Sequence, residues 1–100
     1  MNTINQTLAF AKWFLGLRDR EAKKRILNRI QNAVEGNFGD HKSLGEGVWE
    51  MRITHGPGYR LYYGRDGMTV YLLILGGDKK TQENDVADAK AIWMELKKRN

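Results

Sequence analysis

Cysteine is absent from the 100-residue sequence, and this absence removes several kinds of chemistry at once. Without cysteine the chain can form no disulfide, bind no metal through thiolates and use no thiol nucleophile. Histidine is also scarce, because only His41 and His55 occur, and their separation does not match a metal-binding spacing. No glycine-rich phosphate loop of the Walker or Rossmann type is present. We therefore expect neither a metal ion nor another cofactor.

Long apolar stretches are lacking as well. The apolar run at residues 8–11 is interrupted by Lys12, no basic segment precedes it, and no small-residue cleavage pattern follows it. No stretch approaches the length of a membrane span. We therefore expect neither a secretory signal within residues 1–17 nor a membrane partner. Together with the lack of cysteine, this predicts a cytoplasmic protein.

The composition is that of an ordinary globular protein, with 41% hydrophobic and 29% charged residues. A chain of 100 residues can bury a core without disulfides, so we expect a single domain over residues 1–100. The net charge of +5 favours an anionic partner, such as a nucleic acid or an acidic protein.

Three runs rich in β-branched and aromatic residues, at 48–54, 59–65 and 68–76, predict consecutive antiparallel strands. Asp66 and Gly67 predict a two-residue type I′ turn between the last two strands. That turn would place Arg65 opposite Met68, Tyr63 opposite Val70, Leu61 opposite Leu72 and Tyr59 opposite Ile74. The predicted core face then consists of Trp49, Met51, Ile53, Leu61, Tyr63, Val70, Leu72 and Ile74.

The opposite face is predicted to be polar, with Glu50, Arg52, Arg60, Tyr62 and Tyr71 above Leu73 and Leu75. The first hairpin should place Arg52 across from Arg60 and Glu50 across from Tyr62. Two like charges directly opposite each other are unfavourable. Either Glu50 bridges the arginines in a solvated face, or an anion binds between them.

Helical periodicity at residues 8–17 and 22–34 predicts two helices joined by very few residues. Asp19 should cap the second helix, whose basic residues Lys23, Lys24, Arg25 and Arg29 are interpreted as a solvated face rather than an RNA contact. Residues 1–7 and 41–44 could each add a short strand, and Thr81 should cap a C-terminal helix. The predicted fold is α+β: an N-terminal helical hairpin packed on a twisted antiparallel sheet of three to four strands, followed by a C-terminal helix.

Three segments carry a resemblance to a known family. They are GDHKSLGEGVWEMRI at 39–53, GPGYRLYY at 56–63 and LILGGDKKTQ at 73–82. In order and spacing they resemble the RelE/ParE superfamily of toxins, and most closely the phage-derived, HigB-like killer proteins of type II toxin–antitoxin modules. The resemblance covers nearly the whole chain.

The resemblance implies a RelE-like fold with a concave basic groove on the sheet face away from the helical hairpin. It also implies a ribosome-dependent mRNA endonuclease that blocks translation. Its implied partners are the ribosome, mRNA and a cognate antitoxin, which would be a small helix-turn-helix protein from the adjacent gene.

RNA can be cleaved without metal by attack of the 2′-hydroxyl on the adjacent phosphate, which needs a base, an acid and cations. We interpret Arg60 as the phosphate clamp, because its planar fork matches phosphate oxygens and its position matches the family's strand arginine. Glu50 could be the base, provided that the two arginines do not lower its pKa too far. Lys79 could stabilise charge or donate the proton.

Further residues are interpreted as RNA-binding. Arg52 and Lys80 would hold the backbone, Lys42 could reach it from the preceding loop, and Tyr62 and Tyr71 could stack on a base. Several RelE-like toxins carry a histidine or tyrosine near the end of the last strand as acid or base, but here Gly76, Gly77 and Asp78 occupy that place. His55 could substitute as acid or base.

Two other functions are compatible with the sequence. ParE-like members of the superfamily share the fold but inhibit DNA gyrase without cleaving RNA, and a basic RNA-binding module would need no catalytic groups. ParE-like toxins lack a working set of basic and acid–base residues on the sheet face. The presence of Glu50, Arg52, Arg60 and Lys79 therefore favours the nuclease.

Overall fold

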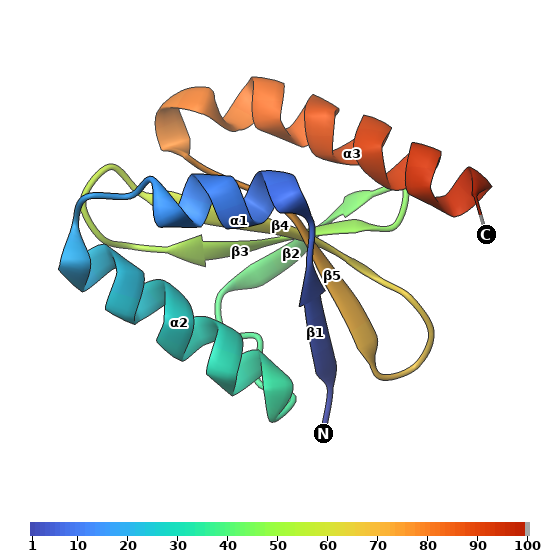
Figure 1. Ribbon diagram of the computed structural model, residues 1–100, viewed down its shortest axis with the longest axis horizontal. Helices are drawn as coiled ribbons and strands as arrows, with labels where there is room; N and C mark the ends of the chain where they lie inside the picture. The colour runs from blue at the N-terminus through green and yellow to red at the C-terminus, as the bar shows by residue number, and fades with distance from the viewer. Residues whose placement is uncertain (100) are drawn as a thin grey trace.

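A five-stranded sheet forms the middle of the computed structural model, which describes residues 1–99 (Figure 1). Its strands are β1 (Thr3–Gln6), β2 (His41–Gly45), β3 (Val48–Ile53), β4 (Tyr59–Arg65) and β5 (Val70–Asp78), in the order β1-β5-β4-β3-β2. Strands β2 to β5 pair antiparallel, as predicted. The short N-terminal strand β1 pairs parallel to β5, so the sheet is mixed rather than purely antiparallel.

Three α-helices accompany the sheet: α1 (Leu8–Leu15), α2 (Arg20–Val34) and α3 (Gln82–Lys98), the last preceded by the 3₁₀ turn η1 (Lys79–Thr81). The side chain of Thr7 caps α1 by accepting from the amide of Phe10. Asp19 caps α2 by accepting from the amides of Glu21 and Ala22, as predicted. The α+β class and the C-terminal helix are therefore confirmed. No helix within residues 1–99 is both long and apolar enough to cross a membrane.

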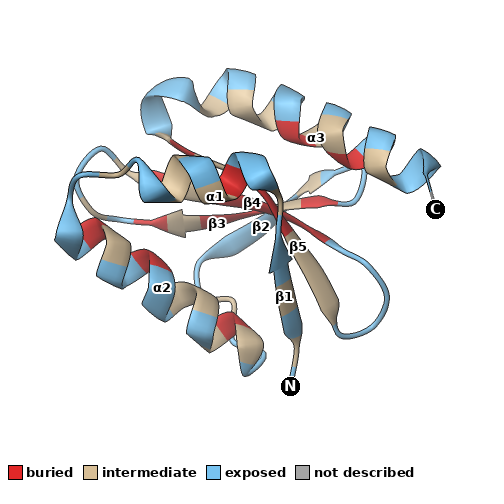
Figure 2. Cartoon of the chain, in the orientation of Figure 1, coloured by how far each residue is buried: buried red, intermediate tan, exposed pale blue. Residues whose placement is uncertain are grey.

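The helices cover both faces of the sheet (Figure 1). On one face, α1 and α2 bury a core of Phe10, Ala22, Ile26, Ala33, Met51, Ile53, Tyr59, Leu61, Tyr63 and Leu73. On the other, α3 buries Val48, Tyr62, Ile74, Ala89 and Trp93. Figure 2 shows the buried residues concentrated in the central strands and on the sides of the helices that face them. The face predicted to be open and polar is thus partly covered by α3.

Two glycines of the sheet make room for tryptophan rings on opposite faces. A Cβ at Gly64 would lie 2.6 Å from the ring of Trp93, and a Cβ at Gly76 would overlap the ring of Trp13. Gly76 and Gly77 were predicted to end the last strand, but they lie inside β5. Their lack of a side chain therefore serves close packing rather than strand termination.

The predicted register of the last hairpin is wrong. Arg65 lies opposite Tyr71 rather than Met68, and a bulge shifts the pairing between Tyr62 and Tyr63. A type I′ turn needs positive φ at both central residues, but only Gly67, at 93°, has it in this turn. The Arg65 guanidinium instead donates to the carbonyls of Gly67 and Met68, which stabilises a wider loop.

The register change exchanges the faces of several β5 residues. Leu72 and Ile74 pack towards α3, whereas Tyr71 and Leu73 pack on the side of α1 and α2. Beyond the bulge Leu75 packs towards α3, on the face predicted for it. A change in pairing of this kind reverses faces because side chains alternate along a strand.

Leu61 is fully buried on β4, whereas Leu15 at the end of α1 is 73% exposed. Leu61→Ala should therefore lower the free energy of unfolding by about 2–5 kcal/mol, through lost apolar contacts and a cavity. Leu15→Ala removes the same atoms from an exposed site and should change the free energy of unfolding by less than about 0.5 kcal/mol. Urea unfolding of both variants would measure the difference, and equal effects would contradict the described core.

Candidate functional site

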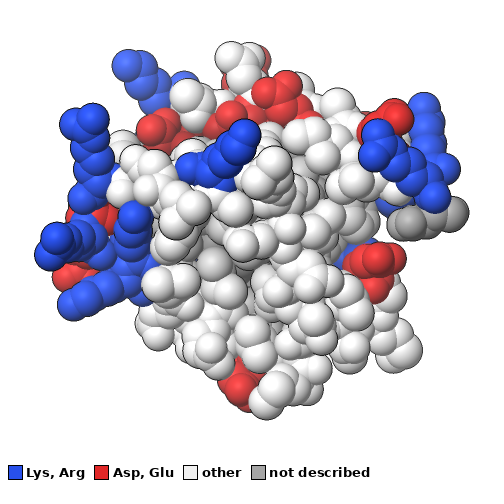
Figure 3. Space-filling view, viewed as in Figure 1, with Lys and Arg blue, Asp and Glu red and all other residues white. Residues whose placement is uncertain are grey.

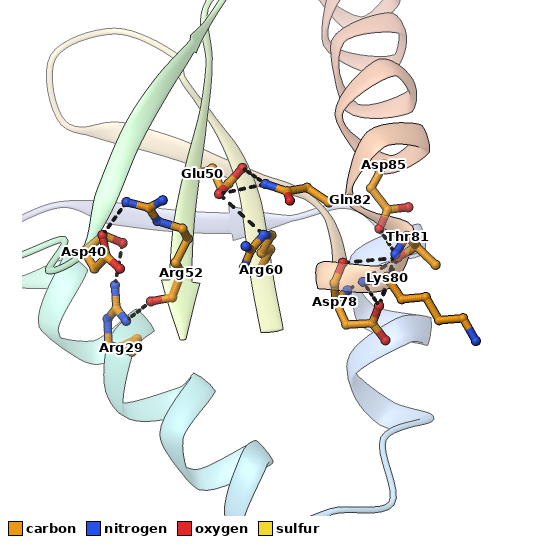
Figure 4. Close-up of polar contacts among 10 residues, drawn as sticks. All are labelled: Arg29, Asp40, Glu50, Arg52, Arg60, Asp78, Lys80, Thr81, Gln82 and Asp85. Atoms are coloured by element: carbon orange, nitrogen blue, oxygen red, sulfur yellow. Dashed lines mark hydrogen bonds and ion pairs between the residues drawn. The ribbon is translucent and has the colours of Figure 1, made fainter. Parts of the chain in front are cut away.

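Glu50 on β3 forms the centre of a buried polar cluster (Figure 4). Its side chain is fully buried, with one carboxylate oxygen 3.6 Å from Nε of Arg60. The amide of Gln82, the first residue of α3, donates to both carboxylate oxygens at 3.2 and 3.4 Å. A buried carboxylate needs such partners, because an unpaired charge would be strongly destabilising.

The predicted register of β3 and β4 is confirmed: Arg52 lies opposite Arg60, and Glu50 lies opposite Tyr62. The two arginines pair with separate carboxylates. Glu50 contacts Arg60 but does not bridge both arginines, because Arg52 donates to Asp40 at 2.9 Å. Each arginine therefore has its own carboxylate partner within the protein.

The burial of Glu50 changes its predicted role. A general base must come within hydrogen-bond reach of the proton that it accepts. With no exposed surface and with α3 above it, Glu50 cannot meet a substrate hydroxyl in this structure. The geometry instead makes Glu50 a positioning residue for Arg60.

A pocket of about 520 Å³ opens beside Arg60 at the end of the sheet. We call it the cation pocket, after the cationic side chains that line it. It is lined by Asp40, Arg52, Ile53, Thr54, His55, Gly56, Pro57, Gly58, Arg60 and Lys79. The Arg60 side chain is 12% exposed and the Arg52 side chain 36%. Nε of each arginine is buried without a hydrogen-bond partner within residues 1–99. The lining holds three cationic side chains and the Asp40 carboxylate, and Glu50 offsets the charge of Arg60 from behind, so the pocket keeps a positive charge that suits an anion.

The position of Lys79 depends on the capped turn that follows β5. The Asp78 side chain accepts from the amides of Lys80 and Thr81, which starts η1 immediately after the strand. Lys79 then lies against the β3–β4 loop, because a Cβ at Gly58 would be 3.5 Å from the Lys79 Cβ. The structure thus brings Lys79 to the pocket, whereas Lys80 is exposed and does not line it.

His55 also lines the pocket, and its ring is held by Asp19. Its Nε2 lies 3.0 Å from Oδ2 of Asp19, the residue that caps α2. The pKa of Asp19 is lowered below its usual value, first by the backbone amide of Ala22 and then by His55. Asp19 is therefore an ionised acceptor near neutral pH, so Nε2 of His55 carries the proton in this contact and Nδ1 is the ring nitrogen left outside it.

Besides Lys80, three residues predicted to bind RNA do not line the cation pocket. Tyr62 is fully buried under α3, and burial, followed by the charge of Glu50, raises the pKa of its hydroxyl. Its ring cannot stack on a base. Tyr71 lies on the other face of the sheet, and Lys42 is exposed on the edge strand β2, outside the pocket.

Sequence reasoning missed Gln82, Asp40 and Arg29. The guanidinium of Arg29 donates to the carbonyls of Arg52, Phe38 and Asp40, which fastens the loop before β2 to the end of β3. Burial lowers the pKa of Arg29. No signal in the sequence separates Arg29 from its basic neighbours on α2, because only the fold places carbonyl groups around it.

Lys and Arg side chains gather over the turn between α1 and α2 (Figure 3). Exposed Arg18, Arg20 and Lys24 belong to this region. Lys23 lies over the Phe14 ring at 5.6 Å, and Arg25 is 3.9 Å from Glu21. These contacts agree with the interpretation of Lys23, Lys24 and Arg25 as a solvated face, whereas Arg29, which was included in that prediction, is bound to backbone carbonyls instead. Within residues 1–99, no three His, Asp or Glu side chains are grouped to hold a metal ion.

The geometry defines a small basic α+β protein with a positively charged pocket at one end of its sheet. No protein-family model matches the chain. A protein of Haemophilus influenzae (strain ATCC 51907 / DSM 11121 / KW20 / Rd), described as an uncharacterized protein, is 42% identical over 93 residues, which cover 93% of this chain and 94% of the relative. The chain belongs to the same family as that Haemophilus protein.

The Asp19–His55 contact predicts a pH-dependent contribution to stability. Because the pKa of Asp19 is lowered from 3.8 in the folded protein, its charged form stabilises the fold above that pH. This contribution should be lost as the pH falls through 3.8 and below. Asp19→Asn should therefore be less stable than the parent protein at pH 7, and the gap should narrow in acid.

Thermal unfolding at a series of pH values would measure this gap. Repeating the comparison in a His55→Ala background supplies the control, because one cause of the lowered pKa is then missing and the gap at neutral pH should be smaller. A gap that is independent of pH would contradict the assignment.

Proposed function

We propose that the protein is the toxin of a type II toxin–antitoxin system, with a RelE-like fold in which α1 and α2 form the helical hairpin. In this proposal it is a ribosome-dependent mRNA endonuclease that blocks translation. A cognate antitoxin, a small helix-turn-helix protein, neutralises it. The observation that carries the proposal is Arg60, held at the cation pocket by the buried carboxylate of Glu50.

The cation pocket suits an RNA phosphate for three reasons. Arg60 presents a planar set of donors, which matches two phosphate oxygens. Its contact with Glu50 restrains the side chain before substrate arrives, so little reorganisation is needed in the transition state. Arg52 and Lys79 add positive charge on either side of it, and Gly56 and Gly58 contribute no side chains to the loop wall of the pocket.

The reaction is attack of a 2′-hydroxyl on the adjacent phosphorus, which breaks the bond to the 5′-oxygen. His55 accepts the hydroxyl proton at Nδ1, since Asp19 holds the proton on Nε2. Arg60 and Arg52 stabilise the charge that develops on the phosphate oxygens. Lys79 donates a proton to the departing 5′-oxygen. Glu50 and Gln82 take no direct part and orient Arg60.

Arg60→Ala should remove a donor that acts mainly in the transition state, and should slow cleavage by a factor of about 100 to 1,000. Arg60→Lys should recover only part of the rate, because a single ammonium cannot form the two-point contact. Primer extension on ribosome-bound transcripts would measure cleavage. Lys24→Ala, on the exposed face of α2, is the matched control and should cut normally. Undiminished cleavage by a folded Arg60→Ala protein would remove Arg60 from the site.

Induced expression should arrest growth through translation, because the proposed substrate is mRNA. Pulse labelling should show that protein synthesis falls before DNA synthesis. Co-expression of the neighbouring gene should restore growth if that gene encodes the antitoxin. An earlier fall in DNA synthesis, with inhibition of gyrase supercoiling by the purified protein, would instead support the ParE-like function.

A further inference from the structure

A second opening lies on the side of the sheet covered by α1 and α2, away from Glu50 and Tyr62. It has a volume of about 160 Å³ and is lined by Phe38, His41, Trp49, Tyr63, Arg65 and Tyr71. We call it the aromatic pocket. Tyr63 is buried, whereas Trp49 and Tyr71 are partly exposed. Five of its six lining residues carry flat rings, a concentration that the proposed nuclease site does not use.

The walls of the aromatic pocket are held by ring-to-ring contacts. Phe38 stacks on Tyr63 with centroids 5.2 Å apart and planes inclined by 15°, and it lies 4.9 Å from the Tyr71 ring. His41 lies 5.8 Å from the Trp49 ring. Such contacts fix the rings before a ligand arrives, which lowers the entropy cost of binding.

Charge at the aromatic pocket restricts the ligand. Aromatic rings alone would also suit a quaternary ammonium group. Here Arg65 lines the pocket, and its guanidinium is held by the carbonyls of Gly67 and Met68 at 2.8 and 3.0 Å. A fixed positive charge repels a cationic ligand and favours a planar ring that is joined to an anion.

His41 adds a directional polar group. Its Nδ1 lies 2.7 Å from the carbonyl oxygen of Gly39, which can only accept a hydrogen bond. Nδ1 therefore carries the proton, and Nε2 of the neutral ring is an acceptor. The amino and imino groups on the edge of a nucleobase are hydrogen-bond donors, which match the acceptor Nε2 of His41.

The size of the aromatic pocket indicates whether it binds a whole small molecule or one ring of a larger ligand. Pockets that enclose a drug-sized ligand usually measure about 300–1,000 Å³. This pocket, of about 160 Å³, admits a ring and leaves the attached groups outside. We propose that it binds one unpaired base of a single-stranded nucleic acid by stacking, with the adjoining phosphate against Arg65. The proposal does not depend on the nuclease activity of the cation pocket.

Nuclear magnetic resonance of the full ¹⁵N-labelled chain can test the proposal. The probes are a uridine tetranucleotide and a tetranucleotide of the same charge that lacks its bases. The first should shift the amide signals of residues 41, 49, 65 and 71 and the Trp49 indole signal. The second should not shift the indole signal. Equal shifts with both probes, or shifts confined to residues lining the cation pocket, would overturn the proposal.

Substitutions in and outside the aromatic pocket provide a second test of the proposal. Tyr71→Leu keeps an apolar side chain but removes a stacking surface, and should weaken binding at the aromatic pocket by about 5- to 150-fold. His41→Ala alters an exposed residue and should weaken it less. Arg60→Ala should leave the shifts at the aromatic pocket unchanged, even if the proposed function of the cation pocket is wrong. Unaltered affinity in a folded Tyr71→Leu protein, or a stronger response to tetramethylammonium, would contradict a base-binding site.

Discussion

The contact between the buried Glu50 carboxylate and its two partners is the constraint on which the arrangement of the site depends. Arg60 comes from the neighbouring strand and Gln82 from the first position of α3, so one side chain joins β3, β4 and the C-terminal helix. Removing one partner from such a cluster destabilises the protein by more than the intact cluster contributes to stability, because a buried charge is left uncompensated. The same contact that fastens α3 to the sheet thus orients the arginine at the pocket.

The sheet also determines which residues are kept apart. Its two faces carry different functions in our interpretation: Glu50, Arg60 and Tyr62 lie towards α3, whereas the aromatic pocket lies on the side of α1 and α2. Close helix packing on both faces is possible because Gly64 and Gly76 leave space for the rings of Trp93 and Trp13. The cation pocket is open because it lies at the end of the sheet, where the β3–β4 loop meets η1.

Much of the fold could be predicted from local patterns, since strand alternation, helical periodicity and the Asp19 cap of α2 are recorded in neighbouring residues, although the predicted cap Thr81 makes no capping hydrogen bond to α3. The pairing of Arg52 with Arg60 followed from the hairpin between β3 and β4. The β4–β5 register could not be predicted, because it depends on hydrogen bonds from Arg65 to its own turn. Of the predicted site residues, the structure brings Arg60, Arg52, Lys79 and His55 to one pocket. The burial of Glu50 and Tyr62 was missed because sequence alone does not show where α3 packs.

The parallel strand β1 affects the order in which the strands of the sheet can pair. Thr3 pairs with Val70, and the Thr7 hydroxyl donates to the carbonyl of Ile74, 67 positions along the chain. Contacts between such distant segments require closure of a long loop and generally form slowly. During synthesis, β1 must therefore wait for β5, the last strand of the sheet in chain order, before it gains its partner. This edge of the sheet closes only after the other strands have been made.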